Sequence, residues 1–82
     1  MRFEARIEVV HRPGIADPQG ATVQRALPAL GWGNVSDVTI GKSIRVTLEA
    51  DDEAAARRQV DEMCARLLTN PVLEDFRVEL RS

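Results

Sequence analysis

Charged and apolar residues alternate without a break along the stretch Arg2-Phe3-Glu4-Ala5-Arg6-Ile7-Glu8-Val9. Because successive side chains of a strand point to opposite faces, this period of two predicts a β-strand with one buried face and one charged, solvated face. The same alternation returns twice farther along the chain, with apolar residues at Ile44, Val46, Leu48, Phe76, Val78 and Leu80. The sequence therefore predicts an antiparallel sheet, the kind of sheet that tolerates water on one face.

A first helix is predicted to follow the first strand. Asp17 suits the N-cap, and Pro18 suits the first helical position, where its missing N–H would be unpaired anyway. Apolar residues then recur at helical spacing, at Val23, Ala26, Leu27 and Leu30, before the stop signal Gly31-Trp32-Gly33-Asn34. Pro28 interrupts this run, which costs about 3 kcal/mol inside a helix. The helix is therefore either kinked or loosened in its last turn.

The middle of the chain allows two interpretations. Val38 and Ile40 precede Gly41-Lys42, and the second alternating stretch follows it. This arrangement predicts a two-stranded hairpin, or else one long strand bent at Gly41.

A second helix is predicted after Asp51 and Asp52, which supply a cap and negative charge at its start. Asn70 and Pro71 are expected to end it. Six residues form its predicted apolar stripe: Ala56, Val60, Met63, Cys64, Leu67 and Leu68.

The predicted element order is βαββαβ, which indicates an α+β fold. We expect a ferredoxin-like antiparallel sheet with both helices on one face, formed by residues 1–82 as a single domain. A chain of 82 residues has a small core, and the sheet edges are open to pairing, so we expect a homo-oligomer.

Composition excludes several classes of protein. The formal charge of −2 comes from interspersed acidic and basic residues, and aromatic residues are sparse, which argues against a nucleic-acid-binding surface. No apolar run approaches the length that crosses a membrane, and the first residues lack the apolar core of a signal peptide. A single cysteine cannot form an intrachain disulfide, which fits a reducing compartment. We therefore expect a soluble, cytoplasmic protein.

No catalytic constellation and no metal site is predicted. Cys64 lies on an apolar stripe, far in sequence from the sole histidine, His11, which we expect to be an exposed loop residue. Glu74 and Asp75 are adjacent in a strand and should point to opposite faces, so they are not expected to share a substrate. Trp32 is expected to cap the end of the core, with an exposed interface anchor as the alternative. Gly41-Lys42-Ser43 lacks both the earlier glycine and the following helix of a phosphate-binding loop.

Several short motifs nevertheless occur in a distinctive order. They are Asp17-Pro18-Gln19-Gly20, Gly41-Lys42, Met63-Cys64, Leu67-Leu68, Asn70-Pro71 and Glu74-Asp75. Together they resemble the PurS family, the small subunit of phosphoribosylformylglycinamidine synthase, also called formylglycinamide ribonucleotide amidotransferase. The resemblance covers essentially the whole chain.

This resemblance implies a non-catalytic bridging subunit in purine biosynthesis. A glutaminase subunit would release ammonia, and a synthetase subunit that uses ATP and Mg would incorporate it. This chain would bind no cofactor itself. It would form a homodimer or a dimer of dimers, assemble the two enzymes and support ammonia transfer between them. The resemblance suggests as partner-binding residues Asp17, Gln19, Lys42, Asn70, Glu74 and Asp75.

Two alternatives remain from other classes of protein. The first is a small-molecule-sensing βαββαβ regulatory domain, which would bind an effector between two copies. The second is an acylphosphatase-like enzyme, which would need a phosphate-binding loop with an arginine after the first strand. Arg12 is present there, but Pro13 removes a backbone donor.

Overall fold

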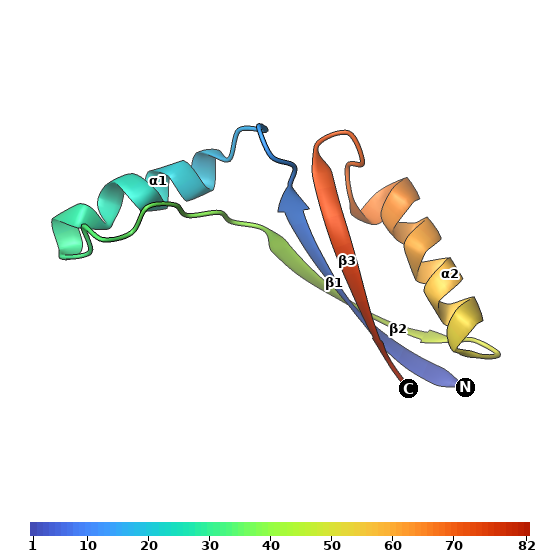
Figure 1. Ribbon diagram of the computed structural model, residues 1–82. Coiled ribbons are helices and arrows are strands. Elements are labelled where there is room, and N and C mark those ends of the chain that lie inside the picture. The colour runs from blue at the N-terminus through green and yellow to red at the C-terminus, as the bar shows by residue number, and fades with distance from the viewer.

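The computed structural model describes residues 1–82 and contains one three-stranded antiparallel sheet (Figure 1). The strand order is β2-β1-β3, so the first strand of the chain is the central one. In chain order the elements are β1 (Arg2–His11), α1 (Pro18–Ala26), the 3₁₀ turn η1 (Pro28–Leu30), β2 (Lys42–Glu49), α2 (Glu53–Met63), the π turn η2 (Cys64–Leu68) and β3 (Glu74–Arg81). The predicted α+β fold class with an antiparallel sheet is confirmed.

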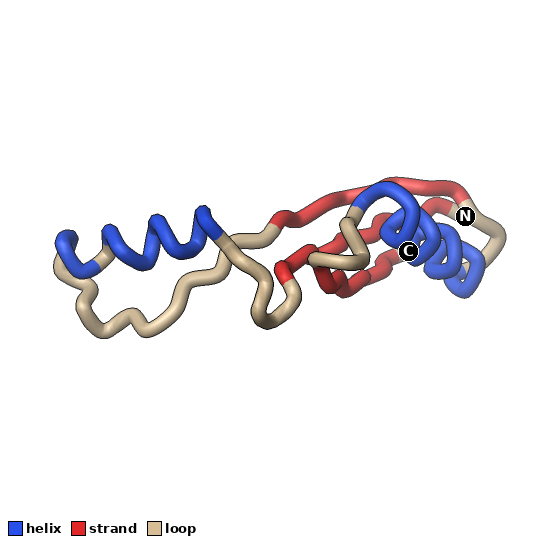
Figure 2. The backbone as a smooth tube through the Cα atoms, turned by 90° about the horizontal axis from the view of Figure 1, so that it is seen from above, coloured by secondary structure: helices blue, strands red, loops and turns tan.

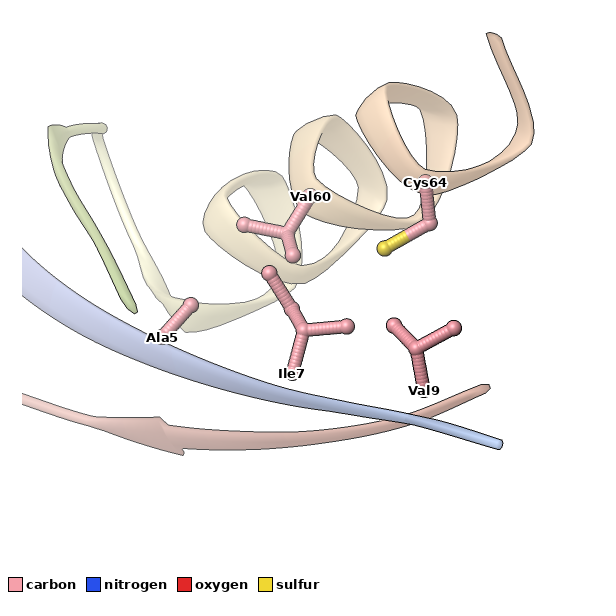
Figure 3. Close-up of a cluster of buried hydrophobic side chains, with 5 residues drawn as sticks. All are labelled: Ala5, Ile7, Val9, Val60 and Cys64. Carbon is pink, nitrogen blue, oxygen red and sulfur yellow. The ribbon is translucent and has the colours of Figure 1, made fainter. Parts of the chain in front are cut away.

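The core lies between β1 and α2. Ala5, Ile7 and Val9 point from β1 toward Val60 and Cys64 of the helical segment, and all five side chains are buried (Figure 3). The apolar residues of β2, together with Val78 and Leu80 of β3, pack around this cluster and are half-buried. The period of two in β1 is therefore confirmed, and the opposite face of the sheet carries the charged residues, as predicted.

The segment before β2 differs from the predicted hairpin. Residues 35–41 form no strand, and β2 begins only at Lys42. Together with α1, this segment forms an arm, residues 17–41, that extends away from the sheet (Figures 1 and 2). Only α2, and not α1, covers the sheet, so the prediction that both helices lie on one face does not hold within a single chain.

The arm makes the molecule elongated. The radius of gyration of the whole chain is 16.4 Å, whereas a compact chain of this length would have a radius of gyration of about 12 Å. Trp32 lies at the far end of the arm and is 54% exposed, so the prediction that it caps the core is wrong. Gly20 is the only buried residue of α1. The arm therefore has almost no core of its own.

Pro28 ends α1. The α-helical residues stop at Ala26, and Pro28 begins η1, which closes on Gly31 with a left-handed φ of 106°. This arrangement avoids the loss of an internal hydrogen bond, because the proline occupies the first position of a new turn.

Neither α1 nor α2 is long and apolar enough to cross a bilayer.

The end of α2 widens into a π turn, which changes the side that each residue faces. In a continuous α-helix Leu67 would lie about 20° around the axis from Val60 and would be buried. In η2 the backbone N–H of Thr69 donates to the carbonyl of Cys64, five residues earlier, at 3.1 Å. Leu68 consequently packs on the core, whereas Leu67 is 83% exposed. The prediction that Leu67 belongs to the apolar stripe is therefore wrong.

Candidate functional site at the junction of sheet and arm

The six residues suggested as partner-binding residues lie near one end of the sheet, where β1 leads into the arm. Lys42 and Glu74 are the first residues of β2 and β3, and they flank the end of β1, opposite Val9 and His11 respectively. The ammonium Nζ of Lys42 is 4.0 Å from the carboxylate Oε1 of Glu74. Gln19 of α1 lines the same small hollow, of about 140 Å³. The sequence motifs, which extend from Asp17 to Asp75, thus meet at what we call the junction.

Asp17 connects the start of α1 to the segment that precedes β2. Its carboxylate accepts one hydrogen bond from the backbone N–H of Gly20, at 3.0 Å, and another from the backbone N–H of Ile40, at 2.9 Å. These two bonds lower the pKa of the Asp17 carboxyl, and the nearby His11 adds to the effect. The predicted N-cap role is confirmed, and the bond to Ile40 adds a second role that the sequence did not indicate.

Two motif glycines are explained by close backbone approach. A Cβ on Gly20 would collide with the Asp17 carboxylate and with the carbonyl oxygen of Val38. A Cβ on Gly41 would collide with the carbonyl oxygen of Val9. Both glycines therefore allow residues 38–41 to lie against their neighbours, which brings Lys42 to the end of β1.

Asn70 and Glu74 form a local turn. The backbone N–H of Asn70 donates to Glu74 Oε1 at 2.8 Å, and Asn70 Oδ1 accepts from the backbone N–H of Val72 at 3.1 Å. Glu74 therefore has a local structural role, which was not expected from the sequence. The Lys42 ammonium, in contrast, has only the 4.0 Å contact to Glu74, and its side chain is 53% exposed. Lys42 is thus a charged residue of the junction that is free to meet another molecule.

Arg12 and Asp75 close the outer side of the junction. Arg12 Nε lies 3.3 Å from Asp75 Oδ1 and also donates to the backbone carbonyl of Glu74 at 3.3 Å. These contacts hold the Arg12 side chain against β3. The guanidinium is therefore not directed into a backbone cradle after the first strand, as an acylphosphatase-like loop would require.

His11 of the junction and Gln24 of the arm have roles that were not predicted from the sequence. His11 is the last residue of β1 and is half-buried, not an exposed loop residue, and its Nδ1 is buried without a hydrogen-bond partner. Gln24 accepts from the backbone N–H of Val38 at 3.1 Å and donates to the carbonyl of Ser36 at 3.2 Å. The only sign in the sequence that Gln24 holds the arm together was the presence of a polar residue on the inner side of α1.

Cys64 is a structural residue of the core. Its side chain is fully buried under β1 (Figure 3), and burial, with a smaller contribution from Asp61, raises the pKa of the thiol. A thiol with a raised pKa is a poor nucleophile at neutral pH. The prediction of a buried structural cysteine is confirmed.

Comparison with known proteins places this geometry in a family. The family model for PurS, described as phosphoribosylformylglycinamidine (FGAM) synthase, matches residues 4–82. The chain is 49% identical over 78 residues to the PurS subunit of phosphoribosylformylglycinamidine synthase from Synechocystis sp., covering 95% of this chain and 78% of the relative. The corresponding PurS subunit from Bacillus subtilis is 38% identical over 82 residues, covering 95% and 92% of the two chains.

Solved structures agree with the sequence relatives. Bacillus subtilis PurS superposes with a TM-score of 0.87 at 38% identity, over 98% of this chain and 99% of that chain. A chain in the structure of PurLQS from Thermotoga maritima superposes with a TM-score of 0.90 at 33% identity, over 99% of both chains. The elongated shape, with its arm, is therefore shared with these solved structures. The comparisons support the resemblance over the regulatory-domain alternative.

Proposed function

Because the chain belongs to the PurS family, we propose that it is the small subunit of phosphoribosylformylglycinamidine synthase and acts in purine biosynthesis. The observation that carries this proposal is the match along the full length of the chain, in both sequence and shape. The motif residues that the resemblance rests on also converge at the junction, although they are distant in sequence.

The role within the enzyme is bridging rather than catalysis. A glutaminase subunit releases ammonia, and a synthetase subunit, which binds ATP and Mg, consumes it; this chain binds no cofactor and joins the two. The reason for a bridge is chemical, since ammonia that escapes into water becomes ammonium, which is not a nucleophile. The Thermotoga neighbour comes from a PurLQS structure, which supports an assembly with two partners. The enzyme is expected to work in the cytoplasm.

The junction is the proposed contact with a partner subunit. Its exposed groups are the ammonium of Lys42, the amide of Gln19 and the carboxylate of Asp75, carried on backbone that Asp17, Asn70 and Glu74 hold in place. Lys42 gives the sharpest test, because its side chain has only one distant contact to lose.

The test reverses the charge of Lys42. We expect Lys42→Glu to keep the fold and to lower glutamine-dependent synthesis in the reconstituted enzyme, while synthesis driven by high free ammonia changes much less. Arg58→Glu is the matched control, since Arg58 is an exposed residue of α2 that forms no ion pair. Unchanged glutamine-dependent turnover in Lys42→Glu would mean that the junction does not bridge.

The arm supports a homodimer. Val23, Leu30 and Trp32 are exposed on it, and its helix buries only Gly20. The apolar side chains of β2 are only half-buried, because α2 packs against β1 and β3. In the proposed dimer the arm of each chain covers this part of the partner's sheet, which would place a second helix on the predicted face. We propose that such dimers pair further into a dimer of dimers in the same enzyme.

The oligomeric state tests this arrangement. We expect the chain to be at least a dimer by light scattering at micromolar concentration, and Leu30→Asp to shift it toward monomer. Arg25→Asp is the control. It places an aspartate on α1 about 200° around the helix axis from the apolar Val23, away from the proposed interface, and it should leave the dimer intact. A strictly monomeric parent chain would refute the proposal.

A further inference from the structure

The open face of the sheet, opposite α2, carries a hollow lined only by charged residues. Its volume is about 180 Å³, and its lining residues are Glu4, Arg6, Arg45, Glu79 and Arg81. They come from all three strands, because even-numbered residues of β1 point to this face together with their neighbours on β2 and β3. The hollow is distinct from the junction, with which it shares no residue.

The strand register sets two arginines directly opposite one another. Arg6 of β1 is paired in register with Arg45 of β2. Like charges in directly opposite positions destabilise a sheet. Arg45 forms no ion pair, and its neighbours on the same face of β2, Ser43 and Thr47, are neutral. Arg6 has one ion pair, to Glu8 on its own strand, at 3.3 Å.

The acidic residues of the hollow form no ion pair with its arginines. Glu79 is opposite Arg6 and Glu4 is opposite Arg81 in the register, yet neither pair approaches within the 4.0 Å of an ion pair. The guanidinium donors of Arg45 and Arg81 are thus left without a protein acceptor. A planar guanidinium is well suited to bind a carboxylate or phosphate group through two parallel hydrogen bonds.

We propose that Arg6 and Arg45 together form a binding site for one oxyanion, the carboxylate or phosphate group of a small molecule. A bound oxyanion would lie between two guanidinium groups and relieve their repulsion. Glu4 and Glu79, which line the same hollow, limit the site to a single anionic group, because they would repel the extended charge of a nucleic acid or an acidic peptide. The volume of the hollow fits a ligand of a few heavy atoms.

The test consists of two NMR titrations of the intact chain, one with inorganic phosphate and one with acetate, at constant ionic strength. We expect saturable shifts of the Arg6 and Arg45 side-chain Nε–H signals in at least one titration, and the anion that binds more tightly is the preferred ligand. Arg45→Gln should weaken this binding about tenfold, the loss of one charge-assisted contact. Glu79→Gln should strengthen it, and Arg58→Gln, on the outer side of α2, should leave it unchanged.

Three results would overturn the site. Shifts that do not saturate in either titration would indicate general charge screening rather than binding. Equal weakening by Arg45→Gln and Arg58→Gln would indicate attraction to net positive charge rather than to this hollow. Binding that survives Arg45→Gln in full would place the anion elsewhere. Each variant's circular dichroism spectrum serves as the check that it is folded.

Discussion

The π turn at the end of α2 makes a sharp prediction about two neighbouring leucines. Leu68 packs on the core and is half-buried, whereas Leu67 is 83% exposed. A fully buried Leu→Ala change costs about 2–5 kcal/mol, so a half-buried site should lose about 1–2.5 kcal/mol in Leu68→Ala. Leu67→Ala removes a side chain that is mostly in water already, and it should change the free energy of unfolding by less than about 0.5 kcal/mol.

Urea denaturation followed by far-UV circular dichroism measures both changes. The two variants control for each other, because they delete the same atoms from adjacent residues. The measurement should be repeated over a range of protein concentrations, since a cost of Leu67→Ala that grows with concentration would indicate a contact between copies rather than a core position. A loss in Leu67→Ala equal to that in Leu68→Ala at every concentration would refute the π turn and restore a continuous α-helix.

Three further expectations concern the core and the arm. Cys64→Ser should lower the free energy of unfolding by about 1–3 kcal/mol, because it buries a hydroxyl group in an apolar core. The glutaminase activity of the assembled enzyme should stay intact. Loss of glutamine hydrolysis without loss of stability would show that Cys64 is a nucleophile. The lowered pKa of Asp17 contributes stability that is present above its unfolded value of about 3.9 and is lost as pH falls through the folded pKa. Acid titration should therefore loosen the arm in the parent chain, whereas Asp17→Asn should lack this transition; identical acid profiles would contradict the role of Asp17. Gly20→Ala should destabilise the arm despite the better helix propensity of alanine, whereas Gly33→Ala, which meets no atom within 4 Å, should be nearly neutral; amide hydrogen exchange of residues 17–41 distinguishes them.

The sheet and the core were predictable from sequence because their signal is periodic. The alternation in β1 identified its buried face, and the helical spacing of Ala56, Val60 and Cys64 identified the buried side of α2. The exposure of Leu67 was not predictable, because a π turn leaves the apolar pattern of the sequence unchanged while it rotates the residues that follow. The arm was missed for a related reason. Apolar residues such as Leu30 give the same sequence pattern whether they pack on their own sheet or are exposed on an arm.

The candidate site was predictable as a set of residues, but not as a geometry. The motifs identified Lys42 and Glu74, and the register of β1 with β2 and β3 is what brings them together. Sequence could not reveal that Glu74 accepts a hydrogen bond from the Asn70 backbone, or that Gln24 holds the arm, because both contacts depend on the conformation of a loop.

The most direct test of the bridging role compares two sources of ammonia in the reconstituted synthase. Glutaminase and synthetase subunits are mixed with and without this chain, and formylglycinamidine ribonucleotide is measured with either glutamine or high free ammonia as the nitrogen donor. We predict that omitting the chain abolishes most glutamine-dependent synthesis and leaves ammonia-dependent synthesis largely unchanged. Equal glutamine-dependent rates with and without the chain would contradict it.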